Sequence, residues 1–396
     1  MKPKEIVLRK WQKLALDKWI ENKFRGIVEV CTAGGKTLFA TTCMGKWLDL
    51  HSNSKVLIIV PTISLLDQWF LTLTDDLNIN PQSISCWPEE SNLDSQFHIM
   101  VVNTARKKSH LVIKDTISMI IADECHRYAS VENAKALEHS TLCTLGLSAT
   151  AERSGDDGLE DILIPSLGPI IYTYDLTQAH KDEIISDYEI FNIKLHFLNE
   201  EKKDYNLLSK RLAIAMSQND EPKIKSISRQ RARVSQAAFN RIPTTIKIVE
   251  ENRGKRTIVF HEQIEKAEVL YQQLQKRGHS VAIYHSRIDP VARRASLRRF
   301  RMGIIDILVC CRALDEGIDI PEAEIAIIAA STSSSRQRIQ RIGRVIRLNS
   351  SKDQAKIYTL YITESEQKRL LEEEQKLKSS SSISVNWFEV KGINNG

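Results

Sequence analysis

The fold of this chain can be inferred from Ile27-Val28-Glu29-Val30-Cys31-Thr32-Ala33-Gly34-Gly35-Lys36-Thr37. Four residues of strand character run into a short glycine-containing loop, and a helix-favouring segment, residues 38–48, follows. Strand, tight loop and helix form a phosphate loop, in which small residues let backbone N–H groups approach a phosphate at a helix N-terminus. Lys36 adds a positive charge beside the β- and γ-phosphates, and Thr37 offers a hydroxyl to magnesium.

The loop departs from the full phosphate-loop pattern at two positions. Val30 stands five residues before Gly35, where the full pattern begins with Gly, and Ala33 takes a position that is often Gly. The alternative interpretation is a surface turn that happens to read Gly-Gly-Lys-Thr. The residues predicted to contact ATP in this loop are Thr32, Ala33, Gly34, Gly35, Lys36 and Thr37.

A second apolar run, residues 117–122, ends in Asp123-Glu124-Cys125-His126. A strand that delivers two adjacent carboxylates at its C-terminal end can place one at a magnesium ion and the other at the water that attacks the γ-phosphate. We expect Asp123, with Thr37, to hold the metal and Glu124 to orient the water. The alternative is an Asp-Glu pair that only ends a buried strand, which the phosphate loop upstream makes a weaker interpretation.

Short apolar runs alternate with helix-favouring segments along most of the chain, which predicts an α/β fold with parallel sheets. The alternation is interrupted by a polar, charged segment, so the sequence predicts two lobes, at residues 1–190 and 243–396, joined by a helical insertion or hinge at 191–242. A helix is expected at residues 289–303, with Asp289 as N-cap and Pro290 in the first turn. Arg294, Arg298 and Arg301 would share one face of it, as a solvated surface or as a contact for phosphates.

Composition limits the class of protein without deciding its function. The chain has 396 residues, 42% hydrophobic content and a formal net charge of +6, which suits a polyanionic partner but also many proteins that have none. No apolar run is long enough to cross a membrane, and residues 1–5 lack a signal peptide's apolar segment, so we expect an intracellular protein without membrane attachment. The seven cysteines lack the paired spacing of a zinc site.

With these motifs in order, the chain resembles a superfamily-two helicase of the DExH kind. Leu8-Arg9-Lys10-Trp11-Gln12 is similar to the adenine-reading motif, Ser148-Ala149-Thr150 to motif III, Ile258-Val259-Phe260 to motif IV, residues 313–321 to motif V and residues 340–347 to motif VI. The resemblance implies two tandem RecA-like lobes that close on ATP and Mg²⁺ and grip a nucleic-acid strand.

The resemblance also implies roles for single residues. Further ATP contacts are expected at Arg9, Gln12, Gly317 and Asp319. Gln340, Arg344 and Arg347 are expected to join Lys36, Asp123 and Glu124 in catalysis, with the two arginines as arginine fingers. Strand contacts are expected at Pro61, Thr62, Asn103, Thr104, His285, Ser286 and Arg312. His126, Ser148 and Thr150 are expected to couple hydrolysis to movement.

An arginine that reaches the γ-phosphate only when two lobes close makes hydrolysis depend on closure. The alternative for the basic residues 336–347 is a solvated helix face. The sequence around Ile346 resembles the XPB-like translocases and related restriction and repair motors, whereas DEAD-box RNA helicases usually carry Gly at that position. This favours DNA over RNA, with an RNA helicase, or a nucleotide-gated clamp that recruits a partner without unwinding, as the alternatives. The recognised motifs are those of the motor alone, so a protein partner that supplies specificity or nuclease activity is also possible.

Overall fold

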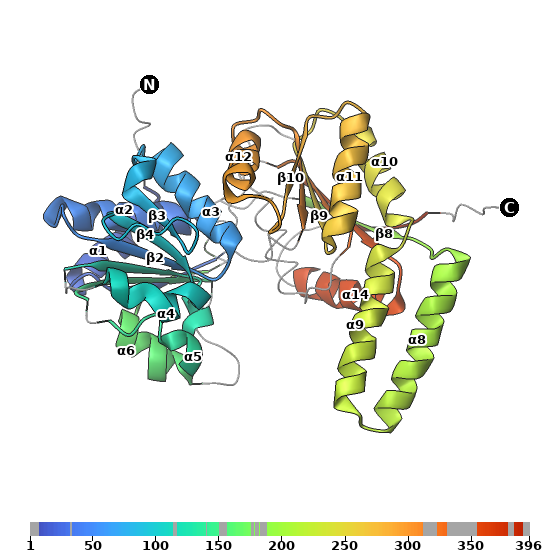
Figure 1. Cartoon of the computed structure of the whole chain (residues 1–396), viewed down its shortest axis with the longest axis horizontal. Coiled ribbons are helices and arrows are strands. Elements are labelled where there is room, and N and C mark those ends of the chain that lie inside the picture. Colours follow the sequence, from blue (N-terminus) through green and yellow to red (C-terminus); the bar gives the residue numbers. More distant parts are fainter. Residues whose placement is uncertain are drawn as a thin grey trace. The chain divides into compact units, whose positions relative to one another are not determined.

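The computed structural model describes most of the chain, and Figure 1 shows its helices and strands. The described residues are 8–31, 34–113, 117–139, 141–149, 157–175, 178, 182, 188–311, 323–330, 355–378 and 384–390. Those up to Asp182 belong to one compact unit and those from Tyr188 onward to a second. The predicted boundary between residues 190 and 191 falls within strand β8 (Tyr188–Lys194) of the second unit.

The first unit is built on a seven-stranded parallel sheet with the strand order β3-β4-β2-β5-β6-β1-β7. Its strands are β1 (Arg25–Val30), β2 (Val56–Val60), β3 (Ile84–Trp87), β4 (Phe97–Val101), β5 (Met119–Asp123), β6 (Cys143–Ser148) and β7 (Ile170–Tyr174). The α-helices are α1 (Lys10–Glu21), α2 (Lys36–Leu50), α3 (Ile63–Leu71), α4 (Val102–Val112), α5 (Val131–Ala134) and α6 (Ile164–Leu167). Shorter turns of 3-10 or π helix are η1 (Thr72–Asp76), η2 (Pro81–Ser83), η3 (Cys125–Tyr128) and η4 (Leu159–Leu163).

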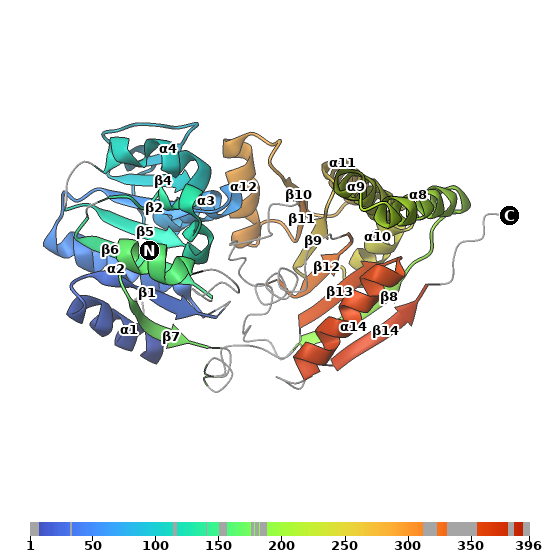
Figure 2. The same ribbon diagram turned by 90° about the horizontal axis from the view of Figure 1, so that it is seen from below.

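Both faces of this sheet are covered by helices, as Figures 1 and 2 show. Alternate residues of the central strand β2 enter different cores, because side chains along a strand point to opposite faces. Val56, Ile58 and Val60 pack with residues of α1, α2 and α3, whereas Leu57 and Ile59 pack with residues of α4 and α6. A strand buried on both sides reads as a continuous apolar run, as the sequence Val-Leu-Ile-Ile-Val of β2 does.

The second unit has its own seven-stranded parallel sheet, with the order β10-β11-β9-β12-β13-β8-β14. Its remaining strands are β9 (Thr257–His261), β10 (Val281–Tyr284), β11 (Ile307–Cys311), β12 (Ile325–Ile328), β13 (Ala355–Tyr361) and β14 (Ser384–Glu389). Its helices are α8 (Asn199–Ser217), α9 (Glu221–Ala237), α10 (Arg241–Glu251), α11 (Ile264–Lys276), α12 (Pro290–Arg301) and α14 (Glu364–Lys378). The prediction of an α/β fold with two parallel sheets is confirmed.

Helix α12 begins where its sequence predicted. The Asp289 side chain accepts hydrogen bonds from the N–H groups of Val291 at 2.9 Å and Ala292 at 3.3 Å. Of the three arginines predicted to share a face, Arg294 is buried and Arg298 and Arg301 are half-buried, so the face is not a fully solvated surface.

The charged segment between the predicted lobes contains two long helices, α8 and α9, which lie side by side as a hairpin in Figure 1. Asp220, in the turn between them, caps α9 by accepting a hydrogen bond from the N–H of Lys223 at 3.1 Å. No described helix is long and apolar enough to cross a membrane.

A buried ion pair joins the first residue of α10, which follows this hairpin, to α14. Arg241 donates to Glu366 Oε1 at 2.7 Å and to the carbonyl oxygens of Ala329 and Leu360 at 2.6 and 2.8 Å. Burial alone would raise the pKa of Glu366, but Arg241 and the N–H groups of Ile362 and Thr363 together hold that pKa below its ordinary value. Glu366 is therefore a carboxylate whose charge is fully matched inside the unit.

Arg241→Ala is expected to lower the free energy of unfolding of the second unit by about 3–5 kcal/mol, because it leaves the Glu366 carboxylate buried without its cation. Urea unfolding followed by circular dichroism measures this. Lys247→Ala on the same helix is the matched control, since Lys247 is 75% exposed and its pair with Glu251 spans 3.8 Å. Equal stability of the two variants would contradict the structural role of Arg241.

Candidate active site

The phosphate loop and the two carboxylates meet at one edge of the first sheet. In the order β5-β6-β1, the loop that starts at Cys31 follows β1, and Asp123 ends β5. Because all three strands are parallel, their carboxyl ends lie on the same side, which is where ligands bind in open α/β sheets. The strand order therefore places the predicted phosphate loop beside the predicted catalytic carboxylates.

Glycine is required at both described loop positions before Lys36. Gly35 has φ of +98°, and a Cβ added there would lie 2.9 Å from Nε2 of Gln12. A Cβ added at Gly34 would collide with the Val30 side chain. The backbone is thus held in a close turn just before the first residue of α2.

Two side chains at the start of α1 stabilise this turn by hydrogen bonds. Arg9 Nη1 donates to the carbonyl oxygen of Gly34 at 3.1 Å, and Gln12 Nε2 donates to that of Gly35 at 3.1 Å. Gln12 also accepts from the backbone N–H of Arg9 at 2.8 Å, so the two side chains are mutually oriented. Both residues were predicted to contact the nucleotide, and the structure places them against the phosphate loop.

The central contact of the site is an ion pair between Lys36 and Glu124. Lys36 Nζ lies 2.7 Å from Glu124 Oε1, with side-chain exposures of 15% and 6%. Glu124 follows β5 in a left-handed conformation with φ of +51°, which turns the chain sharply after Asp123. Two residues that are 88 positions apart are thereby brought into direct contact.

Asp123 is oriented in part by side chains that belong to none of the sequence motifs. Trp69 on α3 donates its indole N–H to Asp123 Oδ2 at 3.0 Å, and the backbone N–H of Glu124 donates to Oδ1 at 3.0 Å. Tyr128 donates its hydroxyl to the carbonyl oxygens of Asp123 at 2.7 Å and Ile59 at 3.0 Å. No motif connects Trp69 to Asp123, since their contact depends on how α3 packs on the sheet.

His126 lies between the carboxylates and the end of β6. Its Nδ1 is 2.9 Å from Ser148 Oγ and 3.6 Å from Glu124 Oε2. A continuous series of polar contacts therefore runs from Lys36 through Glu124 and His126 to Ser148.

Cys31 stands at the start of the loop, where its thiol is buried. Burial raises the pKa of its thiol to about 11, although the nearby charges of Lys36 and Arg9 oppose this shift. All seven cysteines are free, and the described part of the chain contains no group of three His, Cys, Asp or Glu side chains that could hold a metal. A metal at this site would thus need further ligands from a bound nucleotide or water.

The predicted strand-contacting residues of the first unit follow two paired strands. Val60 of β2 is paired with Val101 of β4, and helices α3 and α4 begin just beyond these ends. Thr62 caps α3 by accepting from the N–H of Leu65 at 3.3 Å. Pro61 lies beside Thr62, and Asn103 and Thr104 lie in the first turn of α4. Two helix N-termini at one sheet edge favour phosphate oxygens.

In the second unit, His285 and Ser286 follow β10. His285 is buried, with its Nε2 3.5 Å from Glu268, and burial lowers its pKa. Ser286 is exposed. Their contact with a strand stays a prediction.

Nine predicted site residues lie outside the described part of the chain, and their roles stay predictions. They are Thr32, Ala33, Thr150, Arg312, Gly317, Asp319, Gln340, Arg344 and Arg347.

Comparison with protein families gives two matches. Residues 5–153 match the family model described as "Type III restriction enzyme, res subunit". Residues 240–349 match the model described as "Helicase conserved C-terminal domain". The first match spans the phosphate loop and the carboxylates.

Comparison with single proteins gives relatives over most of the chain. The "DNA 3'-5' translocase XPB2" of Sulfurisphaera tokodaii is 27% identical over 87% of this chain and 79% of its own length. The "Putative DNA 3'-5' helicase Rad25" of Haloarcula marismortui is 26% identical over 83% of this chain, which spans 49% of that relative. Among solved structures, Saccharomyces cerevisiae Dbp5 bound to RNA and ADP BeF3 matches with a TM-score of 0.63 and 16% identity, over 96% of this chain and 89% of the other. At that identity the structural match bears on the fold alone.

Proposed function

Since this chain belongs to the superfamily-two helicases, with two tandem RecA-like lobes, we propose that it is an ATP-hydrolysing motor that moves along duplex DNA. The observation that carries the proposal is the direct contact of Lys36 with Glu124 below the phosphate loop. A structural ion pair alone would explain neither the left-handed turn at Glu124 nor the two glycines before Lys36. A phosphate site at the start of α2 with a carboxylate beside it accounts for both features.

The residues at this edge fit ATP and a magnesium ion. The first turn of α2 has backbone N–H groups directed beyond its N-terminus, and the two described residues just before it, Gly34 and Gly35, carry no side chain. Asp123 supplies carboxylate oxygen, the ligand type that Mg²⁺ prefers, and Thr37 supplies a hydroxyl at the start of α2. When bound, the metal would neutralise charge on the phosphates.

The Lys36–Glu124 pair gives each residue a second task. The Lys36 ammonium can exchange the Glu124 carboxylate for phosphate oxygens, since both partners are anionic oxygen ligands. Glu124 Oε1 would then be available to accept a proton from an attacking water. Nucleotide binding would thereby release the Glu124 carboxylate from Lys36, so that it can act as the general base.

His126 lies where it would respond to the loss of the Lys36–Glu124 contact. The His126 imidazole contacts Ser148 and lies close to Glu124. A movement of the Glu124 carboxylate would therefore change which hydrogen bonds the imidazole can form. We infer that this is the route by which hydrolysis is coupled to movement of the segment after β6. Arg344 and Arg347 are proposed to act at the γ-phosphate on the strength of the motif alone.

DNA is proposed as the track because both reported relatives carry names that specify DNA. The choice of duplex DNA rests on the resemblance of the sequence around Ile346 to the XPB-like translocases. The net charge of +6 suits a polyanionic track but does not distinguish DNA from RNA. Dbp5, which was solved with RNA, shares the fold at 16% identity.

A panel of polynucleotides tests the track. ATP turnover by the wild-type chain is measured with duplex DNA, single-stranded DNA, duplex RNA and single-stranded RNA at matched nucleotide concentration. The proposal expects the largest stimulation from duplex DNA. Stimulation by RNA alone would overturn the assignment of the track and support the RNA-helicase alternative.

Trp69→Phe tests the assignment of Asp123 as the metal ligand. The change keeps an aromatic ring in the core but removes the N–H that fixes Asp123 Oδ2, and partners that orient a metal ligand are typically worth about 10–100-fold in metal affinity or activity. We expect the Mg²⁺ concentration for half-maximal turnover to rise by a factor in that range.

Trp47→Phe is the matched control, because Trp47 is a buried tryptophan in the same core and donates to Ser54 Oγ, away from the carboxylates. An equal change in Mg²⁺ dependence in both variants would show a general packing effect and contradict the role given to Asp123.

A further inference from the structure

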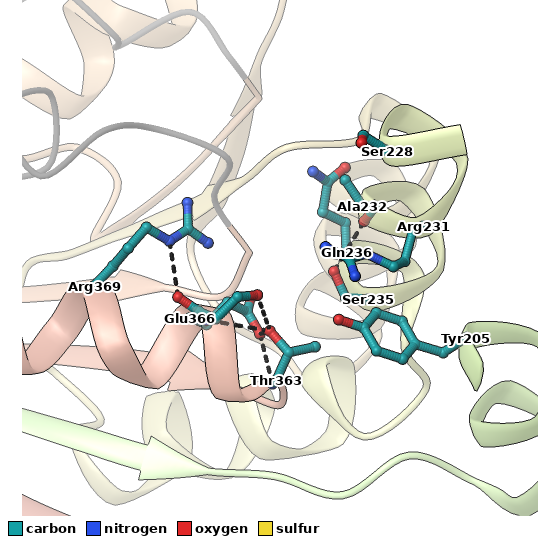
Figure 3. Close-up of a pocket in the computed structure, with 10 residues that line it drawn as sticks. Tyr205, Ser228, Arg231, Ala232, Ser235, Gln236, Thr363, Glu366 and Arg369 are labelled. Atoms are coloured by element: carbon teal, nitrogen blue, oxygen red, sulfur yellow. Dashed lines mark hydrogen bonds between the residues drawn. The ribbon is translucent and has the colours of Figure 1, made fainter. Parts of the chain in front are cut away.

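The second unit contains a polar pocket of about 260 Å³ where the α8–α9 hairpin meets the start of α14. Figure 3 shows Arg369 reaching towards it from α14, and Arg231, Gln236 and Tyr205 lining it from the hairpin. The volume leaves room for a phosphate group and several waters, each of which occupies about 30 Å³ in the liquid.

The pocket is cationic. Glu366, the one carboxylate in its lining, is neutralised by the buried Arg241. Arg231 lies over the Tyr205 ring, with 5.5 Å between the guanidinium carbon and the ring centroid, and Arg369 donates from Nε to the carbonyl oxygen of Ser365 at 3.2 Å. Within the described ranges, neither of these two guanidinium groups has a carboxylate partner within 4 Å. Among the described residues, two positive charges are thus directed at one concavity without a carboxylate paired to either of them.

The other lining groups are hydrogen-bonding groups of the kind that bind phosphate oxygens. Ser228, Ser365 and Gln236 also line the pocket, and their side chains carry two hydroxyls and an amide. Guanidinium and hydroxyl donors together are the usual partners of a phosphodiester in protein contacts with a nucleic-acid backbone. A solvated basic surface would not require the lining to be concave or to be braced by the Arg241–Glu366 pair beneath it.

We propose that this pocket is a phosphate-binding site, with Arg231 and Arg369 as its ligands, that holds a backbone phosphate of the nucleic acid on which the motor acts. That this phosphate belongs to a nucleic acid rests on the proposed function. The site would anchor the α8–α9 hairpin to the strand through a contact that carries no sequence information, which suits a motor that moves over any sequence.

The test uses the full chain and fluorescent duplex DNA, with affinity measured by anisotropy over a salt series. Arg231→Gln and Arg369→Gln should each reduce the slope of log affinity against log salt by about 1, the change expected for one lost phosphate contact. Ala232→Leu fills the pocket without changing charge and should weaken binding as well. Arg229→Gln, an exposed arginine on the same helix outside the pocket, is the matched control and should leave the slope unchanged.

A slope that is unchanged in both pocket variants, or reduced equally in the control, would overturn the site. A second arm measures binding of tripolyphosphate while the ATP site is saturated with a non-hydrolysable ATP analogue. Binding that depends on Arg231 and Arg369, with no effect on DNA affinity, would keep the phosphate chemistry but reject the strand as its source. If the wild-type chain bound no nucleic acid at all, the proposed function would fail, and this arm would still decide whether the pocket binds phosphate.

Discussion

Lys36→Ala is expected to reduce ATP turnover by about 10²–10³-fold or more. This is the range found when an enzyme loses one preorganised hydrogen-bond donor that stabilises the transition state. Lys36 is the first residue of α2 and its ammonium group pairs with Glu124, so its removal takes away the only positive side chain that the described part of the loop offers to the proposed phosphates. Steady-state phosphate release measures the effect.

Lys46→Ala is the matched control, because Lys46 lies on the exposed face of the same helix. It should leave turnover unchanged, and thermal unfolding of both variants checks that the first unit remains folded. Turnover near the wild-type rate in a folded Lys36→Ala variant would contradict the phosphate-loop assignment.

Glu124→Gln is expected to reduce turnover by about 10²–10⁴-fold while nucleotide binding is retained, since an amide keeps the shape of the side chain but cannot accept the proton of the attacking water. Binding of a fluorescent ATP analogue and single-turnover hydrolysis separate the two effects. Because the amide no longer competes for Lys36 as an anion, ATP affinity should be maintained or increased.

Glu138→Gln serves as its control, since Glu138 is an exposed carboxylate beyond α5. Loss of ATP binding in Glu124→Gln, with the control unaffected, would mean that Glu124 acts as a ligand or structural residue. The division of roles between Asp123 and Glu124 would then be wrong.

The residues that were predictable from sequence are those whose chemistry is local. The phosphate loop follows from the strand, the glycines and Lys36 in direct succession, and the start of α12 follows from Asp289 before Pro290. Central strands such as β2 are buried on both faces and so carry an uninterrupted apolar signal.

Edge strands and long-range contacts were not predictable in the same way. β8 and β14 are neighbours at one edge of the second sheet, and β14 mixes polar with aromatic residues because its side chains are half-buried or exposed. The bond from Trp69 to Asp123 joins residues 54 positions apart, and the pocket beside α14 joins segments that are farther apart still. Such contacts are decided by packing, which no local pattern encodes.

ATP hydrolysis is proposed to drive movement along duplex DNA, and displacement of a triplex-forming strand tests this movement most directly. The wild-type chain with ATP and Mg²⁺ should displace a labelled third strand from a duplex, whereas a non-hydrolysable analogue or the Glu124→Gln variant should not. Hydrolysis that is stimulated by duplex DNA without any displacement would contradict the account, because it would leave a nucleotide-gated clamp in place of a motor.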